Sequence, residues 1–332
     1  MTVSAGEIEL DTAAVGEEQA GEIAGRSPGQ IARSRFRRDK VSMVCLAILI
    51  FFILLAIAAP ILSHVGILDP YTGHPSLVQG IGSMPTGSFG GASADHWLGV
   101  VPQTGNDLLS RVIVGLTSSF IIAASATFIS IFVGTIVGII SGFAGGWVDT
   151  LFGRFMDLVL AFPQLLMLLA LTEPLKDRLK AMGVPDGNTV DFAYIIIVLG
   201  FFGWPYFARI IRGQVLSLRE REFVEAARSL GAKGPRIWFT ELLPNIWAPI
   251  LVYMSLILPQ YIAAEATLSF LGVGVRPPTP TLGNLLTDSV SYLLPDPMYF
   301  WVPGGLLVIV VLAFNLVGDG LRDALDPKSD RH

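Results

Sequence analysis

The chain has 332 residues, of which 52% are hydrophobic and 15% are charged, and its formal net charge is −5. A soluble globular protein carries about 25% charged residues, so this composition excludes an ordinary water-facing surface, and the acidic balance argues against a nucleic-acid partner. Cys45 is the single cysteine, which excludes an internal disulfide and a cysteine-rich metal site.

The net charge of the chain comes entirely from residues 1–30. This stretch contains six acidic residues and one basic residue, Arg26, so the remainder of the chain is electrically balanced. It is rich in alanine, glycine and glutamate and has no apolar period, which is typical of a disordered segment. We therefore expect 1–30 to be a disordered acidic cytoplasmic tail and 326–332 to be a second, short cytoplasmic tail.

Six apolar segments follow, each long enough to cross a bilayer as a helix, which takes about 20 residues. They cover residues 41–62, 112–148, 155–171, 192–208, 246–274 and 298–318. This pattern predicts an all-α integral membrane protein with six transmembrane helices, the third of them bent at Pro163. It divides the chain into a basic segment with the first span (31–62), an outer region (63–110) and a core of five spans (111–325).

Lysine and arginine decide the orientation, because they resist transfer to the outside. Five basic residues crowd in front of the first span, namely Arg33, Arg35, Arg37, Arg38 and Lys40. With six spans, 17 of the 22 lysines and arginines fall on this same side. Both termini are therefore predicted to lie in the cytoplasm, and the region 63–110 is predicted to lie outside.

The cytoplasmic loop 213–245 is densely charged yet patterned for two short helices. Ser217 followed by Glu220 fits a capping box at the start of the first helix. Gly231 supplies the left-handed residue with which many helices end. A second short helix should follow and stop at Pro244. Two short helices folded at a glycine would form a small rigid knob on the inner membrane face.

A longer pattern runs through this loop: a glutamate and two alanines, a glycine four residues on, and a leucine–proline pair twelve residues after the glycine. It resembles the E-A-A loop of ABC importer permeases, with Glu241 where that family has an isoleucine. The resemblance implies that the loop forms coupling helices that dock in a groove of an ATP-hydrolysing subunit. The coupling residues that it implies are Glu225, Ala226, Ala227, Gly231, Leu243 and Pro244.

Three further stretches narrow the resemblance. They are H-W-L-G and G-N-D-L-L-S-R within 96–111, E-A-T-L-S-F-L-G-V-G at 265–274, and A-F-N-L-V-G-D-G-L-R-D-A-L-D-P at 313–327. Together they resemble the C-type subunit of dipeptide and oligopeptide permeases over most of the chain. Asn106 replaces the family's usual arginine, and Leu282 stands where a tryptophan is common.

The resemblance implies a type I ABC importer permease in the bacterial cell (inner or plasma) membrane. Its implied partners are a B-type permease subunit in a heterodimer, two ABC ATPase subunits, an extracytoplasmic peptide-binding protein and the lipid bilayer. ATP and magnesium would be bound by the ATPase subunits, so we expect no cofactor in this chain. Substrate would pass between the two permease chains, and each chain would supply half of the pathway.

Polar residues within the apolar segments are candidates for function, because a charge at membrane depth is costly. Glu265 is a candidate for gating or for interhelical contact, with a purely structural hydrogen-bonding role as the alternative. Asn315 and Asp319 lie four residues apart on the last span and are candidates for the pathway or for anchoring its inner end. Arg154 and Asp157 are three residues apart, a spacing that predicts a structural ion pair on one helix face.

Signatures of catalysis are missing from the sequence. It contains no G-x-x-x-x-G-K-[ST] phosphate loop, no H-E-x-x-H and no G-x-S-x-G, so we expect a transport subunit without catalytic residues. The outer histidines lack ligand-like clustering, and no metal site is expected. The cargo stays open, because a nickel chelate, glutathione or an oligosaccharide would suit the same architecture. A self-contained secondary transporter or a membrane enzyme is the alternative from a different class.

Overall fold

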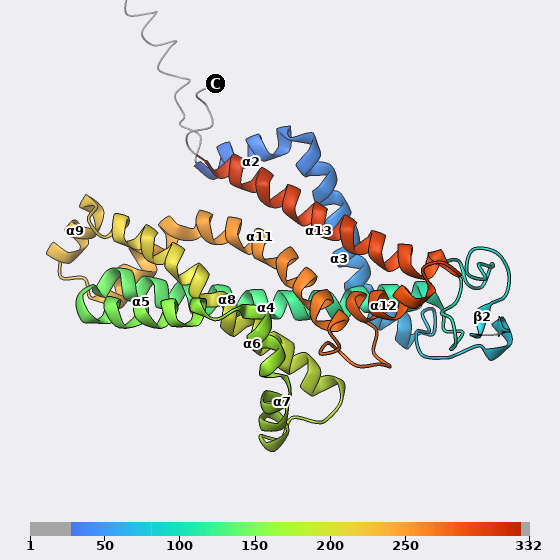
Figure 1. The fold of residues 1–332 in the computed structure, drawn as a ribbon. Helices are drawn as coiled ribbons and strands as arrows, with labels where there is room; N and C mark the ends of the chain where they lie inside the picture. The colour runs from blue at the N-terminus through green and yellow to red at the C-terminus, as the bar shows by residue number, and fades with distance from the viewer. Residues whose placement is uncertain (1–27, 81, 327–332) are drawn as a thin grey trace, which may run out of the picture.

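The computed structural model describes residues 28–80 and 82–326, and this part of the chain is almost entirely helical (Figure 1). The long helices are α3 (Lys40–His64), α4 (Leu108–Ala144), α8 (Asn188–Leu218), α11 (Leu243–Phe270) and α13 (Pro297–Leu325). The shorter helices are α2 (Pro28–Arg38), α5 (Gly146–Ala161), α6 (Gln164–Ala170), α7 (Thr172–Ala181), α9 (Glu222–Ser229), α10 (Gly234–Ile237) and α12 (Leu282–Ser289). The predicted tails 1–30 and 326–332 lie outside the described residues, except that Pro28 begins α2 and Asp326 follows α13.

Five helices in the described part are long and apolar enough to cross a membrane: α3, α4, α8, α13 and the continuous run Gly234–Phe270. Helices α5 and α6 pass the same test together, bent by 78°, which gives up to six spans. The bend falls at Phe162 and Pro163, where proline lacks the amide proton that a continuous helix needs. The predicted all-α membrane fold is confirmed, with the third span broken at its proline.

Helices α4 and α8 run side by side through the middle of the molecule at very close range. Gly134, Gly138 and Gly142 follow one another at single-turn intervals on α4. A Cβ built on Gly138 would stand 2.8 Å from the carbonyl oxygen of Ala208 on α8, and one on Gly142 would stand 2.9 Å from that of Arg212. Small residues at such spacing let helix backbones approach where lipid supplies no hydrophobic driving force. The two helices therefore form a central pair against which α5, α7 and α11 pack.

A buried ionic cluster fastens the outer ends of three elements. The carboxylate of Asp191, in the first turn of α8, is fully buried and lies 2.7 Å from Nζ of Lys176 on α7. Its other oxygen lies 2.9 Å from Nε of Arg276, in the segment that follows α11. This hydrogen bond with Asp191 raises the pKa of Arg276. Because a buried charge is tolerated only when it is paired, the cluster holds α7, α8 and this segment together.

The outer region is compact and closes over the start of α4. It contains a 3₁₀ turn (Pro75–Leu77) and a small antiparallel pair of strands, β1 (Val78–Gln79) and β2 (Met84–Pro85), in which Val78 pairs with Pro85. Asp107 caps α4 by accepting a hydrogen bond from the amide of Ser110 at 2.7 Å, and it lies 3.0 Å from Nδ1 of His96. The outer loop is thereby tied to the first turn of a membrane-spanning helix.

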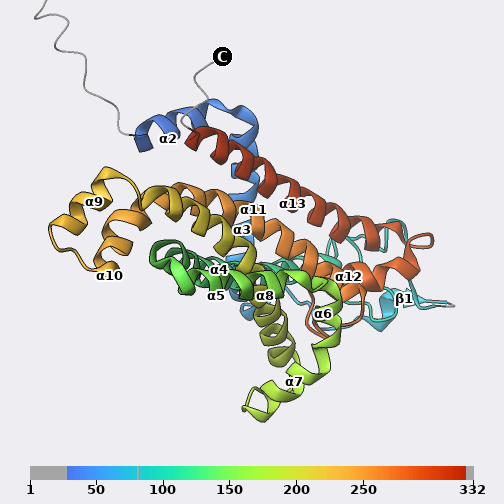
Figure 2. The same ribbon diagram turned by 60° about the vertical axis from the view of Figure 1, so that its left-hand side comes forward.

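Helix α13 crosses back over the body and meets the N-terminal helices. The hydroxyl of Ser42, on α3, donates to the backbone oxygen of Leu316 at 3.1 Å. Nη1 of Arg35, on α2, donates to the backbone oxygen of Asp326 at 2.9 Å. Figures 1 and 2 both show α2 beside the final turns of α13. The segment 28–42 is therefore held against the C-terminal end of the last span.

Replacing Gly138 by alanine tests the contact between α4 and α8. The new methyl group would stand 2.7 Å from Cβ of Ile211, so the helices must separate. We expect the free energy of unfolding to fall by about 1–3 kcal/mol. Gly153→Ala on α5 is the matched control, since nothing lies within 4 Å of its added methyl and alanine favours a helix by up to about 1 kcal/mol. Denaturation of the purified protein in detergent measures both variants, and equal stabilities would contradict the close packing.

Candidate functional site

Helix α9 carries the glutamate and alanines of the predicted coupling loop. It lies at the end of the molecule opposite the β1–β2 hairpin, as both ribbon views show (Figures 1 and 2). Val224 is fully buried and holds the helix to the body, whereas Glu225 and Ala226 are exposed and Ala227 is half-buried. The helix therefore offers a carboxylate beside a flat surface of small side chains, a shape that can seat in a groove.

Gly231 ends α9 in the left-handed conformation that its position predicted. Its φ is +80°, a value that side chains with a Cβ rarely adopt. Its amide donates to the backbone oxygen of Arg228 at 2.9 Å, and the amide of Ala232 donates to that of Ala227 at 3.0 Å. This pair of bonds is a Schellman motif, and it fixes the direction in which the chain leaves the helix.

The predicted capping box at the start of α9 is wrong. Helix α8 continues to Leu218, so Ser217 lies inside it, and α9 begins at Glu222 with no side-chain hydrogen bond at its N-cap, Arg221. The apolar side of α8 explains the difference: Val215 is fully buried near its end. Burial of that side extends α8 past the serine.

The second short helix also differs from its prediction, because it does not stop at Pro244. Helix α10 passes through a π-helical turn (Trp238–Leu242) directly into α11. Pro244 occupies the first turn of α11, where a missing amide proton breaks no hydrogen bond within that helix. Of the remaining predicted residues, Leu243 is half-buried and Pro244 is exposed. The coupling segment is therefore continuous with the fifth span.

Helix α9 and the turn that follows α10 both contact Phe143, at the inner end of α4. The guanidinium of Arg228, on α9, lies over the ring of Phe143 at 4.8 Å from its centroid. The indole of Trp238 meets the same ring edge-on, with the centroids 6.1 Å apart. Ile237 is buried alongside. Helix α9 and the run from α10 into α11 therefore both contact α4 at Phe143.

Glu265 is fully buried at the other end of α11 and joins three helices. One carboxylate oxygen accepts from the hydroxyl of Ser119 on α4 at 2.8 Å, and the other accepts from Ser269, one turn along α11, at 2.9 Å. Ser119 in turn accepts from the backbone amide of Leu282, at the start of α12, at 3.1 Å. The glutamate therefore fastens α12, which lies towards the hairpin end in Figure 1, onto α4 and α11.

Sequence reasoning identified Glu265 but missed its partners. Ser269 was within reach of a spacing argument, because it stands four residues after the glutamate on the same helix face. Ser119 is 146 residues away in the chain. Only the packing of α4 against α11 brings it to the carboxylate.

The structure keeps the two other predicted pathway residues apart from Glu265. Asp319 is exposed on α13 and Asn315 is half-buried. Their neighbour Gly318 packs against Ser255 of α11, ten residues before Glu265. At 1.5 Å per residue this is about 15 Å along the helix. Asn315 and Asp319 therefore lie at one polar position, and Glu265 lies at another.

Two family models match the chain. Residues 134–331 match the binding-protein-dependent transport system inner membrane component, and residues 27–75 match the N-terminal transmembrane domain of oligopeptide transport permease C. The chain belongs to the family of binding-protein-dependent transport inner membrane components. It is a multi-pass membrane permease of an ABC importer, which decides against a self-contained secondary transporter.

Curated relatives are similar over most of their length. The dipeptide transport permease DppC of Alkalihalophilus pseudofirmus is 35% identical, over 91% of this chain and 90% of that protein. The oligopeptide transport permease OppC of Escherichia coli is 36% identical, over 92% and 93%. The glutathione transport permease GsiD of Salmonella typhi is 38% identical, over 91% of each. An inward-facing structure of the MetNI methionine ABC transporter shares the fold, with a TM-score of 0.53 at 18% identity, covering 66% of this chain and 98% of that one.

The predicted ion pair between Arg154 and Asp157 of the permease is wrong. Asp157 instead lies 2.6 Å from Nη2 of Arg209 on α8, and in the described residues Arg154 forms no ion pair. Because α5 packs beside α8, an arginine from the neighbouring helix reaches the carboxylate. Arg212, one turn further along α8, donates to Asp149 of α5 at 2.6 Å. Local spacing could not find these pairs between helices.

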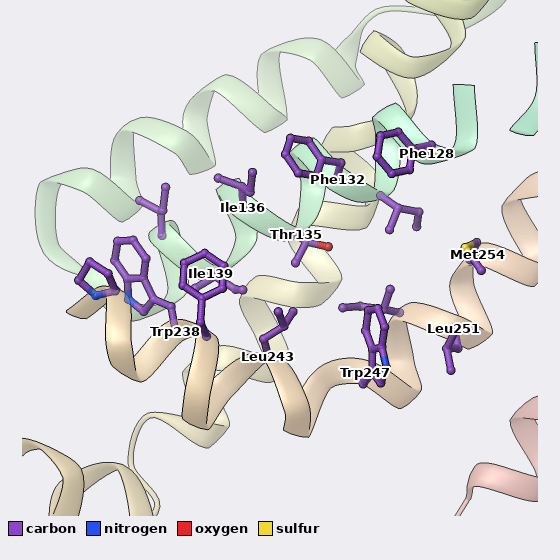
Figure 3. Close-up of a pocket in the computed structure, with 15 residues that line it drawn as sticks. Phe128, Phe132, Thr135, Ile136, Ile139, Trp238, Leu243, Trp247, Leu251 and Met254 are labelled. Carbon is purple, nitrogen blue, oxygen red and sulfur yellow. The ribbon is translucent and has the colours of Figure 1, made fainter. Parts of the chain in front are cut away.

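An apolar groove of about 540 Å³ lies between α4 and the run from α10 into α11 (Figure 3). Phe128 and Phe132 line it from α4, and Trp247 and Met254 line it from α11. No ionisable side chain is among its lining residues. The groove is therefore an apolar surface, distinct from the polar positions on α11 and α13.

Substituting Glu265 tests whether it fastens α12 to α4 and α11. Glu265→Ala would leave the hydroxyls of Ser119 and Ser269 without their acceptor and would open a cavity. We expect the free energy of unfolding to fall by at least about 2 kcal/mol. Glu265→Gln keeps the shape and one amide oxygen, so we expect less than half of that loss. Denaturation in detergent distinguishes them, and a neutral alanine variant would contradict the role.

Proposed function

We propose that this permease is the C-type subunit of an ATP-driven importer of dipeptides and oligopeptides. With a B-type permease it would enclose the translocation pathway between the two chains. Its relatives named for dipeptide and oligopeptide transport, at 35% and 36% identity over nine-tenths of their length, support this cargo. The exposed Glu225 and Ala226 on an anchored α9 are the observation that supports coupling to an ATPase.

The transport cycle would begin at the outer face, where an extracytoplasmic peptide-binding protein delivers its ligand to the region 63–110. Two ABC ATPase subunits would bind ATP and magnesium below the membrane and close around the nucleotides. Their closure would push α9, because Glu225 and the alanines beside it would lie in a groove of an ATPase subunit. Because Arg228 and Trp238 both pack on Phe143, the push would reach α4 and move the spans between inward-open and outward-open arrangements.

The buried polar residues would serve the two ends of this pathway. Glu265 would position α12 at the outer end, because its hydrogen-bonded neighbours lie on α4 and at the start of α12. Asn315 and Asp319 would serve the inner half of α13, where Asp319 is exposed. In this interpretation Glu265 acts through the helices that it joins, whereas Asp319 can meet the substrate directly.

Glutathione is the second candidate cargo. The glutathione permease GsiD is 38% identical over 91% of each chain, an identity as high as that of the peptide permeases. Glutathione also carries amides and charged termini as peptides do, so a pathway of one kind can pass both.

Replacing Glu225 by alanine tests whether α9 couples the ATPase subunits to transport. We expect Glu225→Ala to lower ATP-dependent uptake by about tenfold or more, because a buried charged contact at the centre of an interface dominates binding. Gly231→Val should have a similar effect, since a β-branched residue is strained at φ +80°. The measurement is uptake into proteoliposomes that contain all partner subunits.

The matched control is Glu222→Ala, which removes an exposed glutamate one turn earlier on α9, outside the coupling pattern. It should retain uptake within about twofold. If Glu225→Ala co-purifies with the ATPase subunits and transports at the parental rate, the proposed coupling role is wrong.

Competition between a labelled dipeptide and unlabelled compounds tests which cargo the importer carries. Uptake of a labelled dipeptide should be driven by ATP and reduced several-fold by an excess of unlabelled oligopeptides. It should change little with a nickel chelate or an oligosaccharide. Strong uptake of labelled glutathione without competition by peptides would replace the peptide proposal by the second candidate.

A further inference from the structure

Helix α2 and the first residue of α3 present a cluster of cations at the start of the first span. The side chains of Arg33, Arg37, Arg38 and Lys40 are exposed. In the described part of the chain no hydrogen bond or ion pair holds any of them. Arg35 differs, because it donates to the backbone oxygen of Asp326. Three exposed arginines of α2 and the exposed Lys40 of α3 thus lie close together in the chain, and Arg35 fastens α2 to the body.

The cluster has a fixed place on the permease. Helix α2 packs along the end of α13 in both ribbon views (Figures 1 and 2). Asp39 caps the next helix by accepting from the amide of Val41 at 3.0 Å. Ser42 binds the backbone of α13. The cations are therefore positioned by tertiary contacts rather than carried on a free arm.

An apolar stripe begins directly after the cations. On α3 the exposed side chains include Val41, Val44, Phe51, Leu54 and Ile57, at intervals that keep them on one side of the helix. An exposed stripe of this kind on a membrane-spanning helix meets hydrocarbon. The cations that precede it therefore lie at the depth of the lipid headgroups on the cytoplasmic side.

We propose that Arg33, Arg37, Arg38 and Lys40 form a binding surface for the phosphate groups of anionic phospholipids. A guanidinium donates in a fork that matches phosphate oxygens, and a row of cations beside a span attracts an anionic leaflet. Among the described residues, Asp39 caps α3, and Asp319 and Asp323 of α13 form no ion pair with the four cations. The surface selects anionic over zwitterionic lipid around α2 and α3.

Lipid selectivity of the full-length permease, purified with the subunits that assemble with it, tests the proposal. Spin-labelled phosphatidylglycerol and phosphatidylcholine report the relative association constant for the protein surface in vesicles. The parent should prefer phosphatidylglycerol, and this preference should weaken as salt is added. The triple variant Arg33→Gln/Arg37→Gln/Arg38→Gln should lose about fivefold or more of the preference.

Two matched variants separate charge from structure. Arg178→Gln removes an exposed arginine from the outer helix α7 and should leave the preference unchanged. The lysine version, Arg33→Lys/Arg37→Lys/Arg38→Lys, should retain it, because lysine remains a phosphate binder. If the triple glutamine variant fails to fold, Arg33→Gln and Arg37→Gln alone should each lose part of the preference.

The proposal is overturned by a triple glutamine variant with parental selectivity, by an equal loss in Arg178→Gln, or by a loss in the lysine version. It is equally overturned if the glutamine variant keeps its lipid preference but no longer assembles with its partner subunits. That result would assign the cluster to an acidic protein surface.

Discussion

The close approach of α4 and α8 is the constraint on which the rest of the permease depends. Lipid is as apolar as a leucine side chain, so helices in a membrane associate through packing rather than through exclusion from water. Gly134, Gly138 and Gly142 remove the side chains that would hold the two backbones apart. The resulting pair is the platform against which α5, α7 and α11 pack. A looser pair would misplace both the coupling segment and the buried glutamate.

The two ends of this platform are fastened by different kinds of contact. At the outer end Asp191 and Glu265 are fully buried. Each forms directional polar contacts that join elements distant in the chain. At the inner end α9 and the run into α11 pack on the ring of Phe143 through the guanidinium of Arg228 and the indole of Trp238. Hydrogen bonds to buried carboxyl groups are costly to break singly. Aromatic contacts tolerate sliding, so the inner contacts can adjust while the outer ones change as a unit.

The sequence allowed prediction of several features that depend on local pattern. Apolar length predicted the spans, Pro163 the break in the third, and Gly231 the left-handed end of α9. Predictions about partners depended on packing between helices and failed: Asp157 contacts Arg209 of α8 rather than Arg154 of its own helix. The capping box at Ser217 failed for a related reason, since burial of one side of α8 outweighs a capping preference of about 1 kcal/mol.

Helix α4 connects the two ends and differs from the other long helices in its lack of proline. In the described residues each of α3, α8, α11 and α13 contains an internal proline, whereas α4 contains none over its 37 residues. It bears Ser119 at the buried glutamate and Phe143 at the coupling segment, 24 residues apart, or about 36 Å at 1.5 Å per residue. Helices with prolines bend more readily. Helix α4 therefore gives a continuous helical connection between the buried glutamate and the contacts at Phe143.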